Sequence, residues 1–204
     1  MTSKKGRVLR RADTLLSPSV RKDEPWASPS EKTDSNPYFC VKTTPWREQT
    51  WFHVQATHDL LIVFGRTAES GRIILIRQYR PPVGGYVISA PMGAFAAGPI
   101  DEMSHIAAQE ASNETGHAVL RIEPFLSIYR SPGLTNERAH LYFAVYAEEP
   151  GPQQLHADED IEVLRILPGD SPEVLRSFAR AGDGLDSSIL LLLSQERLQA
   201  LGAF

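Results

Sequence analysis

Cysteine is almost absent from this sequence, because Cys40 is the only one among 204 residues. A single cysteine excludes an intrachain disulfide, and no neighbouring base or helix start would activate its thiol, so Cys40 is expected to be inert. The sequence also lacks a run of about twenty apolar residues and an apolar signal region at its start. These absences predict a cytoplasmic protein that has no membrane partner.

An excess of basic residues is lacking as well. The chain has 21 Lys and Arg against 25 Asp and Glu, which gives a formal net charge of -4. This balance provides no basic field to concentrate nucleic acid, so it argues for a small-molecule ligand rather than a nucleic-acid polymer. The 6 histidines show no metal-ligand spacing, and no transition-metal site is predicted from them.

The chain divides into three segments. Residues 1–37 are polar and rich in Ser, Pro, Lys and Asp, which predicts a loosely ordered segment or arm. Residues 38–58 carry the first strands, in which Trp51 is expected to be a buried anchor rather than a base-stacking side chain. Residues 59–204 are expected to form the main domain, because a chain of 204 residues with 42% hydrophobic residues suffices for one core.

The hydrophobic pattern predicts strands, a helix, further strands and then helices, an order that suits an α+β fold or an α/β/α sandwich. The predicted strands are residues 38–41, 51–56, 60–66, 72–78, 86–90, 119–128, 139–148 and 161–167. The first four are expected to form an antiparallel meander, and a loop is expected after Pro91-Met92-Gly93. Helices are predicted at 101–115 with Gly116 as a left-handed C-cap, after the N-cap Ser171, and from Asp186 to Leu201.

Two carboxylates define the chemistry of the first predicted helix. Glu110 and Glu114 are four residues apart, so they project from nearly the same helix face, with Asn113 beside them. Neither has a basic partner at helical spacing, and a hard divalent cation such as Mg2+ would reverse their mutual repulsion. The alternative is an ordinary solvated helix face. The sequence around the helix decides between the two.

The segments Ser89–Gly93 and Gln109–Gly116 resemble a Nudix box, whose pattern is Gly, five residues, Glu, seven residues, then Arg-Glu-apolar-any-Glu-Glu-any-Gly. Glu110, Glu114 and Gly116 occupy matching positions.

The match has departures. Asp101 stands where the first glutamate is expected, Gln109 replaces the arginine, and Asn113 replaces the middle glutamate. Gly93 lies two residues too far from Asp101. Because Asn113 offers an oxygen without a charge, fewer or more weakly held metal ions are expected.

Four flanking segments, in the right order, resemble the ADP-ribose pyrophosphatase branch of this superfamily. They are Arg77–Val83, Ser131–Glu137, Ala157–Val163 and Gly184–Asp186. With the box, the resemblance covers roughly Leu60 to Leu201. It implies a Nudix fold, an α/β/α sandwich with a mixed sheet, preceded by an N-terminal antiparallel β region.

The activity that the resemblance implies is hydrolysis of the diphosphate bond in a nucleoside diphosphate sugar, with ADP-ribose as the default substrate. The products are a nucleoside monophosphate and a sugar phosphate. The resemblance also implies a homodimer that pairs through residues 38–58. Another nucleotide sugar is an open alternative, and so is a Nudix-fold binding or regulatory protein with little turnover.

The resemblance also implies residue roles. Glu110, Glu114, Asn113 and the carbonyl of Gly93 or Met92 would hold Mg2+, or Mn2+ in its place. Glu110 counts as catalytic for this reason. Glu159 would orient or deprotonate the attacking water. Asp158, Asp160 and Glu162 crowd Glu159 in the sequence, so which of these acids is the base stays open.

Four further residues are candidates for substrate binding. Arg77 and Arg80 belong to the strand end that approaches the phosphates in this branch, and a guanidinium makes paired hydrogen bonds to phosphate oxygens. Arg130 is a candidate for a further phosphate contact. Glu137 is expected to make a water-mediated metal contact or to pair with a neighbouring base such as Arg138.

Overall fold

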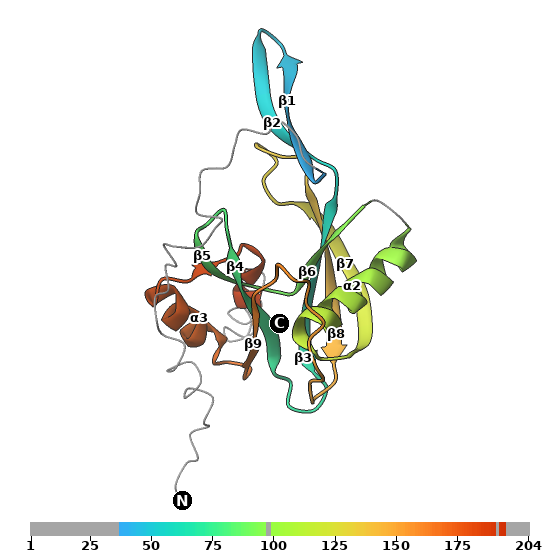
Figure 1. The fold of residues 1–204 in the computed structure, drawn as a ribbon, viewed down its shortest axis with the longest axis vertical. Coiled ribbons are helices and arrows are strands. Elements are labelled where there is room, and N and C mark those ends of the chain that lie inside the picture. Colours follow the sequence, from blue (N-terminus) through green and yellow to red (C-terminus); the bar gives the residue numbers. More distant parts are fainter. Residues whose placement is uncertain (1–36, 97–98, 191, 195–204) are drawn as a thin grey trace, which may run out of the picture.

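The structure, a computed structural model, describes residues 37–96, 99–190 and 192–194, without the side chains of Trp46, Ile100 and Asp101. Nearly all of the predicted N-terminal arm, and the predicted final helix beyond residue 194, lie outside this part of the chain. Figure 1 shows a central sheet with helices on both sides and a hairpin that projects from one end. No helix of the described residues is long and apolar enough to cross a membrane.

An eight-stranded sheet forms the body of the protein. Its strands are β3 (Asp59–Thr67), β4 (Ile73–Arg80), β5 (Gly85–Ser89), β6 (Met92–Phe95), β7 (Val119–Tyr129), β8 (Arg138–Tyr146), β9 (Ile161–Ile166) and β10 (Gly184–Leu185). The main order is β10-β5-β4-β3-β8-β7, with β6 paired to β3 and β9 paired to β4. The pairs β3–β8 and β10–β5 are parallel and the others are antiparallel, so the predicted mixed sheet is confirmed.

Each face of this sheet packs against helices. Helix α2 (Ile100–Thr115) contributes Ala107 and Ala111 to a buried cluster with Ile74 of β4. The neighbouring Leu75 points to the opposite face, where it packs with residues of α3 (Ser171–Arg180) and of the helical residues 188–190 and 192–194. Successive strand residues point to opposite faces of a sheet, so two helical layers cover one sheet. The predicted α/β/α sandwich is confirmed.

Two strands were not predicted. The turn-like Pro91-Met92-Gly93 enters β6, in which Gly93 pairs with Leu61 of β3. The two-residue strand β10 pairs in parallel with β5. Both strands are short, and their residues have weak strand propensity, so their pairing depends on neighbours that are distant in the sequence.

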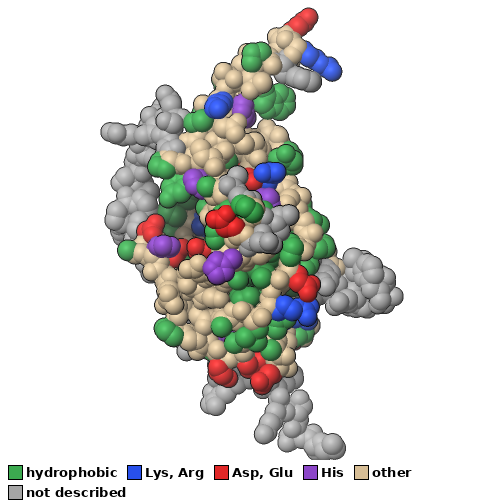
Figure 2. All heavy atoms as spheres, turned by 90° about the vertical axis from the view of Figure 1, so that its right-hand side faces the viewer, with side chains coloured by type: hydrophobic (Ala, Val, Ile, Leu, Met, Phe, Trp, Pro, Cys, Tyr) green, Lys and Arg blue, Asp and Glu red, His purple; other side chains and the backbone are tan. Residues whose placement is uncertain are grey.

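The first four strands do not form the expected meander. β1 (Phe39–Trp46) and β2 (Gln49–Ala56) pair with each other in a two-stranded sheet rather than with β3, and Val54 of β2 forms an isolated bridge with Thr135. Figures 1 and 2 show this hairpin standing out from the body. It is connected to the loop after β7 because Val54 N–H donates to the Leu134 carbonyl at 2.8 Å and Ala56 N–H donates to Asn136 Oδ1 at 2.7 Å.

The helix ends agree closely with the sequence. Helix α2 ends at Thr115, and Gly116 adopts the predicted left-handed conformation at φ 72°. Asp186 Oδ1 accepts a hydrogen bond from the Ser188 N–H at 2.8 Å, which confirms the predicted cap of the last helical segment. Helix α3 differs by one residue, because its N-cap is Asp170 rather than Ser171, and Asp170 makes no side-chain cap hydrogen bond.

Candidate active site

The divergence of two central strands creates the main polar cavity. β3 and β4 pair where Arg66, near the end of β3, meets Ile73 at the start of β4. Away from this point the edge of β3 pairs with β6, and the edge of β4 pairs with β9. The start of β3 and the end of β4 are therefore separated. A cavity of about 620 Å³ opens here. Its lining includes Leu60, Arg80, Met92, Gly93, Glu110, Arg130, Asp158, Glu159 and Asp186.

Glu110 and Glu114 reach this cavity region from α2, and a close strand–helix approach sets their position. A Cβ at Gly93 would lie 2.7 Å from Glu110 Cγ, so only glycine allows β6 to pass this close to the side chain. Glu114 is 4% exposed, and its Oε2 accepts a hydrogen bond from the Met92 N–H at 2.9 Å. The two carboxylates thus flank the Met92-Gly93 backbone.

Glu114 has the most perturbed carboxyl of the cavity. Burial raises its pKa to about 8, and the negative charges of Glu159 and Glu110 act in the same direction. The hydrogen bond from Met92 and the charge of Arg80 oppose this effect. These influences show that three acidic side chains and one arginine share one electrostatic environment. Such a group gains most from a bound cation.

The structure separates the four acids of residues 158–162, of which Glu162 lies in β9 and the others precede it. Asp160 accepts a hydrogen bond from the Tyr86 hydroxyl at 2.6 Å, and Glu162 pairs with Arg77 at 3.2 Å. Both acids therefore have structural partners. Asp158 and Glu159 line the cavity, and Glu159 Oε2 accepts a hydrogen bond from the His156 N–H at 2.8 Å. Of the two, Glu159 is the acid whose charge acts on Glu114 and Arg80.

Arg80 ends β4 and points its positive charge into this acidic environment. Burial lowers its pKa, and so does Arg130, whereas Glu114, Asp186 and Glu159 raise it. Its guanidinium makes no hydrogen bond or ion pair with the described part of the chain. A partly buried guanidinium with open donors is suited to bind an anion such as a phosphate.

Arg130 lines the cavity, and its charge acts on Glu137. Arg130 forms an ion pair with Asp186, the residue that also caps the last helical segment. The pKa of Glu137 is raised by burial, an effect that the positive charge of Arg130 opposes. Sequence reasoning assigned Asp186 only as a cap. Its place in the cavity depends on the parallel pairing of β10 with β5, which no local pattern indicates.

The structure does not bring Arg77 to this cavity. Arg77 is 5% exposed, and its guanidinium donates to both carboxylate oxygens of Asp183, at 2.8 and 2.9 Å, and to Glu162. The same group lies 3.8 Å from the centre of the Tyr86 ring. These contacts support a structural role that joins β4, β9 and the segment before β10.

The structure gives less support to the predicted roles of Asn113 and Asp101. Asn113 is half-buried, and its side chain is not among those that line the cavity in the described residues. The side chain of Asp101, which stands at the position of the first box glutamate, lies outside the described atoms.

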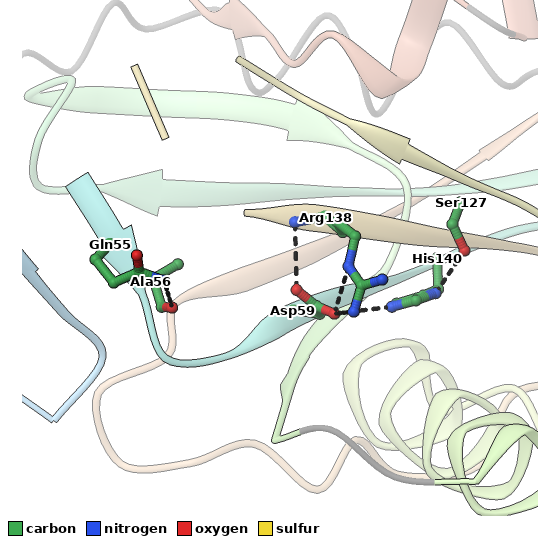
Figure 3. Close-up of polar contacts among 6 residues, drawn as sticks. All are labelled: Gln55, Ala56, Asp59, Ser127, Arg138 and His140. Atoms are coloured by element: carbon green, nitrogen blue, oxygen red, sulfur yellow. Dashed lines mark hydrogen bonds and ion pairs between the residues drawn. The ribbon is translucent and has the colours of Figure 1, made fainter. Parts of the chain in front are cut away.

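A polar network fixes the strand ends beside Glu137. Asp59, the first residue of β3, accepts hydrogen bonds from the Arg138 side chain and backbone and contacts His140 Nε2 at 3.1 Å (Figure 3). The other ring nitrogen of His140 lies 2.7 Å from Ser127 Oγ. The pKa of Asp59 is lowered because the hydrogen bonds from His140 and Arg138 outweigh the effect of burial. This network joins β3, β8 and β7 at the end where Glu137 lies.

The oxygen ligands beside the cavity suit a hard cation that keeps part of its hydration shell. No three His, Cys, Asp or Glu side chains of the described residues converge into a complete metal site. Glu110, Glu114 and the neighbouring carbonyls offer only oxygen ligands. Mg2+ is usually held in this way, by one or two carboxylates together with water and substrate phosphates.

Comparison with known proteins gives several relatives. The chain is 27% identical to an ADP-ribose pyrophosphatase of Bacillus subtilis over 136 residues, which are 65% of this chain and 71% of that protein. It is 36% identical to a GDP-mannose pyrophosphatase of Pectobacterium atrosepticum over 129 residues, 60% of this chain and 64% of that protein. A Nudix hydrolase of Schizosaccharomyces pombe is 29% identical over 122 residues, 57% of this chain and 58% of that protein.

The matches to the second and third relatives span less than two thirds of those proteins. No family model matches the chain. Among solved structures, the crystal structure of an ADP compounds hydrolase is similar with a TM-score of 0.61, over 85% of this chain and 94% of that chain. The two are 16% identical in sequence, so this similarity establishes a shared fold.

Proposed function

We propose that this chain, an ADP-ribose pyrophosphatase-like protein with the Nudix fold, hydrolyses the diphosphate bond of a nucleoside diphosphate sugar with the help of Mg2+. The observation that carries the proposal is the cavity in which Glu110, Glu159 and the open guanidinium of Arg80 meet beside buried Glu114. A diphosphate site needs carboxylates that hold the metal ion, and it needs a positively charged side chain such as arginine that binds a phosphate directly.

Each residue has a distinct task in the proposed reaction. Glu110 and Glu114 would hold Mg2+ together with the carbonyl of Met92 or Gly93, and Mn2+ is a possible substitute. The metal, when bound, neutralises charge on the diphosphate and makes a phosphorus atom more electrophilic. Arg80 would donate hydrogen bonds to phosphate oxygens and thereby orient the diphosphate.

The chemical step needs an activated water. Glu159 would accept a proton from this water as its oxygen bonds to phosphorus and the bond from that phosphorus to the bridging oxygen breaks. Glu159 is favoured over Asp160 and Glu162 because those two acids already have structural partners. Asp158 also lines the cavity and is the alternative base.

The experiment that tests the proposal is product formation from a panel of nucleoside diphosphate sugars and dinucleotides with Mg2+. Glu114→Gln is expected to lower turnover by more than about 100-fold, because residues that only support a metal ligand already cost 10- to 100-fold when lost. Glu102→Gln is the matched control, since Glu102 is exposed on the same helix. Tight binding of nucleotides without turnover of any panel member would favour a binding or regulatory protein instead.

We also propose a homodimer that pairs through residues 38–58, in the cytoplasm. The register of β1 and β2 places Trp51 and Thr44 opposite each other on the face toward Leu134, in an apolar pocket. Trp51 is 51% exposed, so the expectation of a buried anchor is wrong for this chain alone. On the other face Val41 and Phe52 are 55% and 70% exposed. An isolated hairpin is marginally stable in water, and a second copy would cover this apolar face.

A further inference from the structure

The segment between β8 and β9 runs beside the end of α2. The Gly151 N–H donates to the Gly116 carbonyl at 2.7 Å, and the Gln154 N–H donates to the Asn113 carbonyl at 2.9 Å. Between these two contacts, the side chain of Gln153 turns toward the helix. The last carbonyls of a helix have no partner within the helix, and this segment satisfies several of them.

Gln153 makes two side-chain bonds that connect different elements. Its Nε2 group donates to the Glu114 carbonyl at 2.6 Å and to the Ile161 carbonyl at 3.3 Å. Both partners are acceptors, so the group that faces them must be the amide NH2 with its two hydrogens. A carboxylate in its place would face two carbonyls without a donor.

The two carbonyls belong to the elements that carry the acidic groups of the cavity. Glu114 is a residue of the last turn of α2, and Ile161 begins β9 two residues after Glu159. One side chain therefore bonds to the backbone of Glu114 and to the backbone two residues beyond Glu159, and it ties the end of α2 to the start of β9. Asp160, between Glu159 and Ile161, is held at the same end of the loop by the hydrogen bond that the Tyr86 hydroxyl donates to it.

We propose that Gln153 is a positioning residue that sets the distance between the metal-binding carboxylates of α2 and the base on the loop before β9. This role rests on the proposed hydrolytic function. Gln153 touches neither the water nor the diphosphate. It acts through Glu114 and Glu159, and a small displacement of either group changes the rate far more than it changes substrate binding.

The test compares Gln153→Met, which keeps the length and removes both donors, with Gln154→Met as the matched control. Gln154 bonds to α2 through its backbone N–H, and the residue is exposed. With Mg2+ and the best substrate of the panel, Gln153→Met is expected to lower kcat roughly 10-fold or more while KM changes less than about 2-fold. The control is expected to keep the wild-type kcat and KM.

Amide hydrogen exchange provides a readout that does not need turnover. Gln153→Met is expected to accelerate exchange in residues 112–117 and 156–162 together, whereas Gln154→Met leaves the second segment unchanged. If Gln153→Met does not fold, Gln153→Asn keeps the amide one methylene short and is expected to give a smaller loss of kcat. If the folded Gln153→Met variant keeps the wild-type kcat and the wild-type exchange, the positioning role is overturned. A wild type without turnover would overturn the proposed function, with exchange still testing the connection between the two segments.

Discussion

At the scale of single residues, Glu114 shows most clearly how burial and function oppose each other. An acid that is 4% exposed is costly to ionise, and its pKa of about 8 expresses that cost. The same burial removes competing water from a bound cation and strengthens its attraction to the carboxylate. Ionised Glu114 therefore destabilises the metal-free protein and makes the site effective once the metal is bound.

This opposition predicts a pH-dependent stability difference. The unfolded chain releases the Glu114 proton near pH 4.5, whereas the folded metal-free protein keeps it up to about pH 8, so this residue's contribution to stability is lost as pH rises between these values. In EDTA, Glu114→Gln is expected to raise the free energy of unfolding by roughly 2–5 kcal/mol at pH 8.5 and to change it little at pH 5. Urea denaturation at both pH values measures this. An equal difference at the two pH values would contradict the burial argument.

Arg80 gives the second prediction at this scale. Removing a guanidinium that holds the diphosphate is expected to lower kcat/KM roughly 100-fold in Arg80→Ala, because one preorganised donor group is lost from a partly buried site. Steady-state kinetics with the best panel substrate measures the change. Arg165→Ala, an exposed arginine on β9, is the control and is expected to match the wild type. Wild-type kinetics for both variants would show that Arg80 does not bind the diphosphate.

At the scale of elements, the close approach of β6 to α2 places Glu110. Gly93→Ala puts a methyl group 2.7 Å from Glu110 Cγ, so the glutamate or the strand must move. We expect kcat to fall about 10- to 100-fold, with only a small change in Tm, because the neighbour is a side chain that can shift. Gly133→Ala, where no atom lies within 4 Å of the added Cβ, is the control. A fully active Gly93→Ala variant would show that Glu110 tolerates displacement.

A substitution of Arg77 tests whether both arginines of β4, Arg77 and Arg80, bind the substrate or whether Arg80 alone does. Arg77→Met leaves Asp183 without its buried partner, so a loss of about 3–5 kcal/mol in the free energy of unfolding is expected, with KM nearly unchanged. Arg176→Met removes an exposed arginine that pairs with Glu173 on α3, and no measurable change is expected there. Urea denaturation and steady-state kinetics decide the matter. A stable Arg77→Met variant with a strongly raised KM would support the phosphate contact expected from the sequence.

At the scale of the whole molecule, the projecting hairpin is the feature that one chain leaves unexplained. If a second copy covers Val41 and Phe52, Phe52→Glu is expected to shift the protein from dimer to monomer in sedimentation velocity, since a charge would be buried in an apolar interface. Leu120→Glu is the control, because Leu120 is 62% exposed near the start of β7, whereas the hairpin contacts the loop after the end of β7. A monomeric wild type would refute the dimer.

Local physics made much of this protein predictable from its sequence. The span of α2, its left-handed end at Gly116 and the shared face of Glu110 and Glu114 follow from helical spacing and backbone preferences within sixteen residues. The positions of β3, β4, β8 and β9 also follow from local pattern. The resemblance to the Nudix box rests on the same segment, and the confirmed α/β/α sandwich agrees with it.

Other features depended on residues that are far apart in the sequence. The separation of β3 from β4 opens the cavity, and it arises only because β6 and β9 take up the free strand edges. Of four neighbouring acids, two are bound by Tyr86 and Arg77. The other two, Asp158 and Glu159, line the cavity. Spacing along a chain determines which side chains share a helix face, whereas burial, pairing and the pKa of Glu114 are set by contacts that exist only once the sheet has closed around them.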